Sequence, residues 1–150
     1  MKWEVKKFSD LTVYELYSIL QLRSEVFVVE QNCVYQDMDN KDKLSFHVMC
    51  WQDDTLLATA RIIPAGISYT EPSIGRVVTS KITRGNGTGR TLMNIAIEKT
   101  IELYGATDIK IGAQLYLNKF YSSLGFIQTS DVYLEDGIEH IEMLRKAGIS

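Results

Sequence analysis

The chain has 150 residues, a net charge of −3, 45% hydrophobic residues and 23% charged residues. This length and composition predict one globular domain and exclude a disordered chain. The net negative charge excludes a diffuse basic surface for nucleic acid, and no apolar run approaches the ~20 residues of a membrane span. The two cysteines, Cys33 and Cys50, indicate a reducing compartment. We therefore expect a cytoplasmic protein with no nucleic-acid or membrane partner.

The first two predicted elements are a strand and a helix. Residues 3–8 alternate in polarity, which is typical of a strand. Residues 9–31 predict a helix, with Ser9 or Asp10 as its N-terminal cap. The apolar face of this helix is expected to contain Leu11, Tyr14, Leu16, Tyr17, Leu20, Val26 and Phe27.

After a polar, acidic loop, the chain alternates predicted strands with two further helices. The strands are expected over residues 45–52, 56–64, 73–82, 108–113, 126–134 and 140–146. One helix begins after the glycines at 85–89 and ends near Tyr104, where Gly105 stops it, and a short helix covers residues 116–125. This order predicts a mixed α/β fold, with a sheet that carries helices on its faces.

A glycine-rich loop at the start of the second long helix reads Arg84-Gly85-Asn86-Gly87-Thr88-Gly89. The start of a helix favours phosphate because its N–H groups are unpaired and its dipole is positive there, and glycine lets the backbone approach. The loop contains no Walker A sequence, and its third glycine comes one place too early for the Rossmann fingerprint. Its pattern is Arg-x-x-Gly-x-Gly, and the alternative interpretation is a tight turn that holds no ligand.

This loop resembles the acetyl-CoA pyrophosphate cradle of the GNAT superfamily of N-acetyltransferases, and FYSSLGF is similar to that superfamily's Y-x-x-x-G-F helix ending. The stretches LQLRSEVFVVEQNCVYQDMD, ARI, IGRVV, GAQ and YLEDGIEHIEM extend the resemblance to the ElaA-like subfamily over essentially the whole chain. Val34 and Asn40 stand where that subfamily usually has proline and glycine. Gln114 stands where many GNAT enzymes have asparagine.

The resemblance implies the GNAT acyl-CoA N-acyltransferase fold in one domain over residues 1–150. That fold has a mixed, mostly antiparallel sheet splayed between its fourth and fifth strands, with helices on both faces. The implied reaction is transfer of acetyl from acetyl-CoA to a primary amine of a small molecule, by direct attack in a ternary complex. The pantetheine arm would pair with the splayed strand as an added strand. The residues expected to bind the cofactor are Val77, Val78, Thr79, Arg84, Gly85, Asn86, Gly87, Thr88, Gly89, Arg90, Gln114 and Asn118.

The reaction needs a base for the amine and an acid for the leaving thiolate. On the resemblance, Tyr121 is the general acid, and the alternative is a core tyrosine packed among phenylalanines. Glu30, Asp37 and His47 are candidate general bases, and the ordinary histidine pKa of about 6.5 suits that role. No metal is expected, because His47 and Cys50 are three residues apart on a predicted strand and point to opposite faces.

The acceptor pocket is expected near the acidic loop, whose carboxylates would attract a cationic amine. The residues expected to bind the acceptor are Arg23, Tyr35, Asp37, Arg61 and His140. Arg23 has an alternative role in a structural ion pair with Glu30 or Asp37, and either arginine could instead bind an acceptor carboxylate. Asp42 is expected in the solvated part of the loop.

Two other functions of the same fold stay open. One is a sensor that binds CoA or acyl-CoA without turnover. The other is an acyltransferase similar to acyl-homoserine-lactone synthases, with S-adenosylmethionine as acceptor, because LRSEVFVVEQ distantly resembles their entry segment. Closing strands of this kind often pair between subunits, so a homodimer is one possible assembly.

Overall fold

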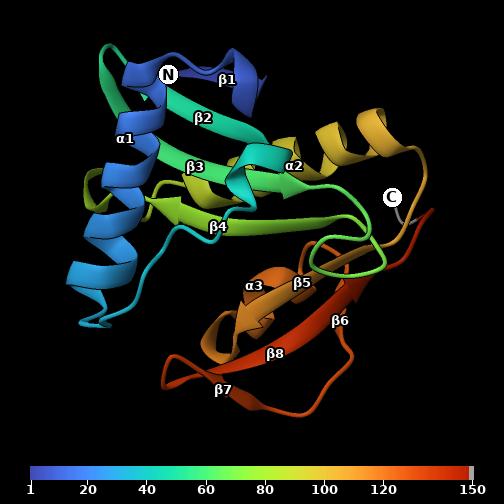
Figure 1. Cartoon of the computed structure of the whole chain (residues 1–150). Coiled ribbons are helices and arrows are strands. Elements are labelled where there is room, and N and C mark those ends of the chain that lie inside the picture. Colours follow the sequence, from blue (N-terminus) through green and yellow to red (C-terminus); the bar gives the residue numbers. More distant parts are fainter. Residues whose placement is uncertain (149–150) are drawn as a thin grey trace.

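Two antiparallel sheets lie side by side in the structure, a computed structural model that describes residues 1–148 (Figure 1). The first sheet has the order β1 (Lys2–Lys7), β2 (Phe46–Gln52), β3 (Thr55–Ile63) and β4 (Ser73–Thr79). In the second sheet, β8 (Ile138–Arg145) pairs with β5 (Ile109–Gln114), β6 (Phe126–Gln128) and β7 (Tyr133–Glu135).

The single strand predicted over residues 126–134 is two short strands, β6 and β7, with a break between them. In the break, the Ser130 hydroxyl accepts a hydrogen bond of 2.8 Å from the Glu142 N–H. A side chain therefore replaces a backbone partner there, which the alternation of polarity could not reveal.

α1 (Val13–Arg23) begins at Thr12 and not at the predicted caps. The Thr12 hydroxyl accepts from the Glu15 N–H at 3.1 Å, and the Glu15 carboxylate accepts from the Thr12 N–H at 2.8 Å. This reciprocal capping box satisfies two N–H groups at once, which explains why Thr12 takes the position. Ser9 and Asp10 lie in the 3-10 turn that precedes the helix.

The face of α1 that meets the sheet also differs from the prediction. Ile19, Leu22 and Arg23 are buried, whereas Tyr14 and Tyr17 are 82% and 71% exposed. Leu22 and Arg23 follow Ile19 by three and four positions, so the three residues share one side of the helix, and the two tyrosines project from the other side. Past Arg23 the helix continues as a wider π-helical segment, Ser24–Glu30.

α1 and α2 (Thr88–Tyr104) cover opposite faces of the first sheet (Figure 1). Along β2, Val48 and Cys50 pack in the core cluster that contains α2, while Met49 packs in the cluster that contains α1. Gly105 ends α2 at a φ of 83°, as predicted. The short α3 (Asn118–Ser122) packs on the second sheet. None of the helices within residues 1–148 is long and apolar enough to cross a membrane.

The predicted splay between the fourth and fifth strands is confirmed. β4 and β5 are joined at one end, where the Lys110 N–H donates to the Pro72 carbonyl at 3.1 Å, and they form no ladder beyond that bond. β4 also carries a bulge: Gly75 lies opposite Arg61 and Val78 opposite Thr59. At the bulge Arg76 has a φ of 49°. The splay leaves one edge of β4 open toward the second sheet.

Candidate functional site

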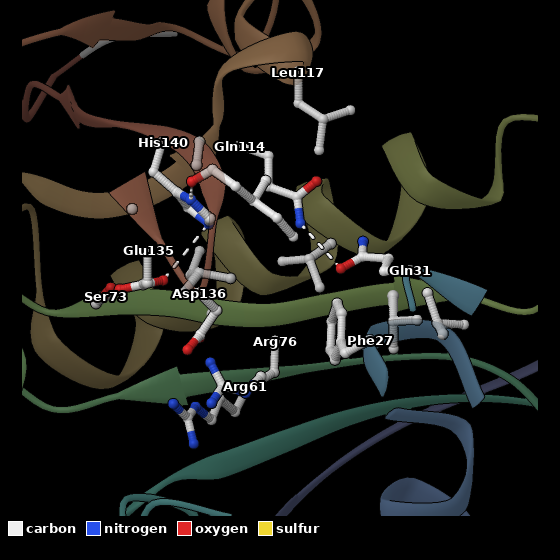
Figure 2. A pocket seen from close by; sticks show the side chains of 18 of the residues that line it. Phe27, Gln31, Arg61, Ser73, Arg76, Gln114, Leu117, Glu135, Asp136 and His140 are labelled. Carbon is white, nitrogen blue, oxygen red and sulfur yellow. Dashed lines mark hydrogen bonds and ion pairs between the residues drawn. The ribbon is translucent and has the colours of Figure 1, made fainter. Parts of the chain in front are cut away.

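A cleft of about 930 Å³ occupies the space that opens between β4 and β5. It extends from the glycine-rich loop before α2 to the turn between β7 and β8. Figure 2 shows side chains from both sheets in it, with Phe27 and Gln31 from the end of the π-helical segment on one side and Gln114 and His140 on the other. We call the end at which Lys110 bonds to Pro72 the closed end of the cleft.

The glycine-rich loop is held in shape by its own side chains. Gly85 and Gly87 have φ values of 86° and 84°, which only glycine adopts without strain. The Asn86 side-chain oxygen accepts from the Thr88 N–H at 3.2 Å, and its amide donates to the Thr83 hydroxyl at 3.1 Å. Asn86 therefore acts inside the loop, and its amide is committed to the turn.

Five backbone N–H groups of the loop make no hydrogen bond within residues 1–148: those of Gly85, Asn86, Gly87, Gly89 and Arg90. They stand at the N-terminus of α2, where the helix dipole is positive. Gly89 lines the cleft, so this end of the helix opens into it. The arrangement has the chemistry of an anion site.

The two loop arginines have different surroundings. Arg84 lines the cleft and forms a bidentate ion pair with Glu30, at 2.6 and 3.1 Å, across the mouth of the loop. The Arg90 guanidinium donates to the Ser123 hydroxyl at 2.8 Å and lies over the Phe120 ring. The Arg90 side chain thus faces α3, and only its N–H remains in the loop.

The residues predicted to contact the pantetheine arm are mostly, but not all, at the cleft. Val77, Val78 and Thr79 line it from β4, and the Gln114 amide reaches across to the Gln31 oxygen at 3.4 Å (Figure 2). Asn118 does not line the cleft. Its amide donates to the Gln128 oxygen at 3.2 Å, and its contact with a cofactor stays a prediction.

Tyr121 lines the cleft from α3, and its hydroxyl has no hydrogen-bond partner within residues 1–148. Its ring packs edge-on against Phe120 and Phe126, so the alternative interpretation of a core tyrosine describes the ring. Burial raises the pKa of the Tyr121 phenol far above its ordinary value. The hydroxyl is therefore a protonated donor at neutral pH.

The surroundings of His47 and Glu30, two of the predicted general bases, differ. His47 is 1% exposed, lies outside the cleft, and its Nε2 bonds to the Asp42 carbonyl at 2.9 Å; burial lowers the pKa of its imidazole. Glu30 does line the cleft, but the hydrogen bonds from Arg84 lower the pKa of its carboxyl. A carboxylate held by a guanidinium is a weak base for an amine.

His140 is the histidine that does line the cleft. Its Nδ1 bonds to the Ile138 carbonyl at 2.7 Å, which requires the proton on Nδ1 and leaves Nε2 as the basic nitrogen. Nε2 lies 3.5 Å from the Glu135 carboxylate, and the ring stacks on Tyr133. Figure 2 shows the imidazole directed toward Glu135.

Behind the acceptor side of the cleft lies a buried ion network that binds α1 to the acidic loop. The Arg23 side chain, 1% exposed, donates to Asp37 at 2.7 Å and to Asp42 at 2.7 and 3.2 Å. The predicted structural pair of Arg23 with Asp37 is present, and the pair with Glu30 is not. Asp42 is 6% exposed, so the expectation of a solvated side chain is wrong. Neither Arg23 nor Asp37 lines the cleft, which corrects their assignment to the acceptor pocket.

The network continues to β3 and β4. Arg61 donates to both Asp39 oxygens at 2.7 Å and to Asp42 at 3.1 Å. Arg76, at the β4 bulge, donates to the Asp37 carboxylate at 2.8 Å and to its carbonyl at 2.9 Å. Asp39 and Arg76 were not predicted as site residues. The available signal was an arginine in each of two apolar strand segments, and acidic residues clustered in one loop.

Of the residues predicted to bind the acceptor, Tyr35, Arg61 and His140 do line the cleft. The Tyr35 hydroxyl donates weakly to Asp37 at 3.4 Å, which connects the cleft wall to the ion network. Among residues 1–148, no three His, Cys, Asp or Glu side chains gather in a geometry that could hold a metal ion.

Comparison with known proteins agrees with this geometry. The profile of the acetyltransferase (GNAT) domain matches residues 6–147. ElaA of Escherichia coli is 42% identical over 148 residues, which are 97% of this chain and 97% of ElaA. The ElaA crystal structure superposes with a TM-score of 0.91 at 41% identity, over 97% of this chain and 99% of that one. The crystal structure of an acyl-CoA N-acyltransferase from Pseudomonas aeruginosa superposes with a TM-score of 0.92 at 42% identity, over 97% and 99%.

Proposed function

The chain belongs to the GNAT acetyltransferase family, and from this membership we propose that it is an acetyl-CoA-dependent N-acetyltransferase acting on a primary amine of a small molecule. The similar protein from Pseudomonas aeruginosa is described as an acyl-CoA N-acyltransferase, which agrees with CoA chemistry in this cleft. Acetyl is the acyl group that we propose, and the amine attacks it directly while both substrates are bound.

The observation that carries the proposal is an open strand edge next to an open helix N-terminus. The β4 edge facing β5 has no ladder partner beyond Pro72, so backbone groups near Val77 are free to pair with the amides of a pantetheine arm. The unpaired N–H groups around Gly89 lie further along the same cleft and suit the pyrophosphate. A plain strand-to-helix turn would need neither feature.

The reaction moves one proton from the amine to the thiol. The amine nitrogen attacks the thioester carbon, and the C–S bond breaks as the C–N bond forms. In our proposal the amine proton goes to His140 Nε2, where the Glu135 carboxylate at 3.5 Å stabilises the imidazolium. The departing thiolate takes the Tyr121 phenol proton, which burial has kept in place. The cycle closes when the imidazolium of His140 releases its proton to solvent and the tyrosinate takes one up. Backbone N–H groups of the splayed β4 would stabilise the oxyanion.

The binding part of this proposal is tested with a Gly89→Asp variant. Gly89 has an ordinary φ, and a Cβ there would meet the Thr79 methyl at 3.8 Å, so the substitution causes no clash. An aspartate in the first turn of α2 stabilises the helix but repels a pyrophosphate. Thr91→Asp is the matched control, because Thr91 is exposed in the same turn and does not line the cleft.

The measurement is the melting temperature with and without acetyl-CoA. At about one hundred times the dissociation constant a ligand adds about 2.7 kcal/mol, and one kcal/mol is worth about 2–4 °C for a protein of this size. We expect the wild type and Thr91→Asp to shift by several degrees and Gly89→Asp not to shift. An equal shift in all three proteins, or none in the wild type, would contradict the proposed cofactor site. A shift with S-adenosylmethionine in place of acetyl-CoA would favour the synthase alternative.

A further inference from the structure

At the closed end of the cleft, four polar groups have no hydrogen-bond partner within residues 1–148. The most informative is Arg61 Nε, because the Arg61 side chain is buried and its two other nitrogens are already bonded to aspartates. The remaining three are the hydroxyls of Ser73, Tyr69 and Tyr133. A buried guanidinium N–H without a partner lowers the stability of the folded protein. A ligand oxygen that accepts a hydrogen bond from this N–H would restore that free energy.

These groups belong to one surface because of how the strands pair. Arg61 lies opposite Gly75, and Ile63 lies opposite Ser73, so all four residues face the same side of the first sheet. A Cβ on Gly75 would stand 3.8 Å from Arg61 Nε, so the glycine lies next to this unpaired nitrogen, which is buried beneath the wall of the cleft. Figure 2 shows Arg61 and Ser73 among the side chains of the cleft wall.

Gly112 on β5 makes room for the two tyrosines. A Cβ at this position would lie 3.0 Å from the Tyr69 hydroxyl and 3.2 Å from the Tyr133 hydroxyl. The backbone does not require glycine there, since its φ is outside the left-handed region. Because Gly112 has no side chain, the hydroxyls of Tyr69 and Tyr133 both lie next to it on β5, across the cleft from Ser73.

The charges of this end favour an anion. Arg23, Arg61 and Arg76 balance Asp37, Asp39 and Asp42 within the ion network. The ammonium of Lys41 then adds an uncompensated positive charge to the same wall, where it donates to the Ser68 hydroxyl at 3.0 Å. Four acidic side chains also line the cleft: Glu30 and Asp39 are held by arginines, Glu135 ends β7 and Asp136 follows it. Burial and the nearby charge of Glu135 both raise the pKa of the Tyr133 phenol, so that hydroxyl stays protonated.

We propose that the closed end binds a carboxylate of the acceptor, through Arg61 Nε and the hydroxyls of Ser73, Tyr69 and Tyr133. The acceptor is then an amine that also carries a carboxylate, as amino acids do. This inference rests on the proposed acetyl transfer and names the substrate class of the same cleft. Burial raises the pKa of Tyr69 to about 12, so its hydroxyl stays protonated and can donate to a carboxylate oxygen.

The experiment compares acceptors that differ only in the carboxyl group. The common L-amino acids are each assayed with acetyl-CoA beside their α-carboxamides and the corresponding amines without the carboxyl group, and phosphoethanolamine is included as a phosphate-bearing amine. Release of free CoA thiol is measured. We expect the carboxylate-bearing member of an active set to have the lower KM, by about tenfold, since a charged hydrogen-bond partner is lost in the others.

Two variants connect the preference to this surface. Ser73→Ala and Tyr69→Phe remove hydroxyls that have no hydrogen-bond partner among residues 1–148, so the fold should be retained. Each should raise the KM of the amino acid several-fold and leave the KM of the amine without a carboxyl group unchanged. Tyr116→Phe is the matched control, because Tyr116 lines the cleft but is 74% exposed and away from the closed end.

The outcomes separate this inference from the proposed function. Acetylation of carboxylate-free amines or of phosphoethanolamine in preference to amino acids would overturn the carboxylate site and keep the acetyltransferase. An equal change of KM for both members of a set in Ser73→Ala would also overturn it. If acetyl-CoA binds but no compound is acetylated, calorimetric titration of the CoA-loaded protein with the same amino acids decides: no binding overturns the inference. Failure of acetyl-CoA to bind would overturn the proposed function itself.

Discussion

The two ends of the cleft are built in opposite ways. The glycine-rich loop is local: Thr83, Asn86 and Thr88 bond to partners at most five residues away. The acceptor side depends on the ion network, where Arg23 meets Asp42 across 19 residues and Arg76 meets Asp37 across 39. One end can be recognised in a short stretch of sequence, and the other exists only after the chain has folded.

The largest loss of stability is expected from breaking the ion network, whose partners are far apart in the sequence. Asp42→Ala would leave Arg23 and Arg61 buried with fewer carboxylates, and it should lower the free energy of unfolding by about 3–5 kcal/mol. The measurement is urea denaturation. Asn86→Ala in the local loop should cost about 1 kcal/mol, the value of one cap.

Asp54→Ala is the surface control for this comparison, because Asp54 is exposed in the β2–β3 turn. Its effect should stay within about 0.5 kcal/mol. If Asp42→Ala costs no more than Asp54→Ala, the network does not hold the acceptor side together.

The next largest effect is on catalysis at the middle of the cleft. Tyr121→Phe removes the phenol proton while keeping the ring that packs on Phe120 and Phe126. We expect kcat to fall by about 100-fold and the dissociation constant of acetyl-CoA to stay the same. Steady-state kinetics and calorimetry measure the two quantities, with Tyr104→Phe as a control because Tyr104 lies outside the cleft. An unchanged kcat would leave Tyr121 as a core residue only.

A smaller effect distinguishes the two roles considered for Glu30. Its ion pair with Arg84 is partly exposed and competes with a bound pyrophosphate for the guanidinium. Glu30→Gln should therefore tighten acetyl-CoA binding by about two- to fivefold, with kcat nearly unchanged. A fall of kcat by about 100-fold would instead restore Glu30 as the general base.

The smallest effect concerns His47 and the pH dependence of stability. Burial lowers the pKa of the folded imidazole below its ordinary 6.5, so the unfolded chain binds the proton first as the pH falls. Neutral His47 thus contributes stability above pH 6.5, and that contribution is lost as the pH falls from 6.5 through the folded pKa. His47→Gln should flatten the unfolding free energy between neutral and mildly acidic pH. If the unfolding free energy of His47→Gln depends on pH as steeply as that of the wild type, the lowered pKa of His47 is contradicted.

The same contrast explains what the sequence could predict. The order of strands up to β5, the loop before α2 and the helix end at Gly105 follow from local patterns, and the structure agrees with them. Thr12, and not Ser9 or Asp10, caps α1, because its reciprocal hydrogen bonds with Glu15 satisfy two backbone N–H groups. The faces of α1, the burial of Asp42 and the roles of Asp39 and Arg76 depend on contacts between distant segments. His47 seemed basic by residue type, and only its burial beneath the network removes it from the chemistry.

The central claim is that acetyl-CoA fills the gap between β4 and β5, and amide hydrogen exchange with and without the cofactor tests it most directly. The account predicts slower exchange for amides near Val77. It predicts the same for the amides of Gly85, Asn86, Gly87, Gly89 and Arg90, which have no partner within residues 1–148. Amides of β1, far from the cleft, should be unaffected except for a small global stabilisation. Unchanged exchange in β4 and in the loop at saturating acetyl-CoA would contradict the account.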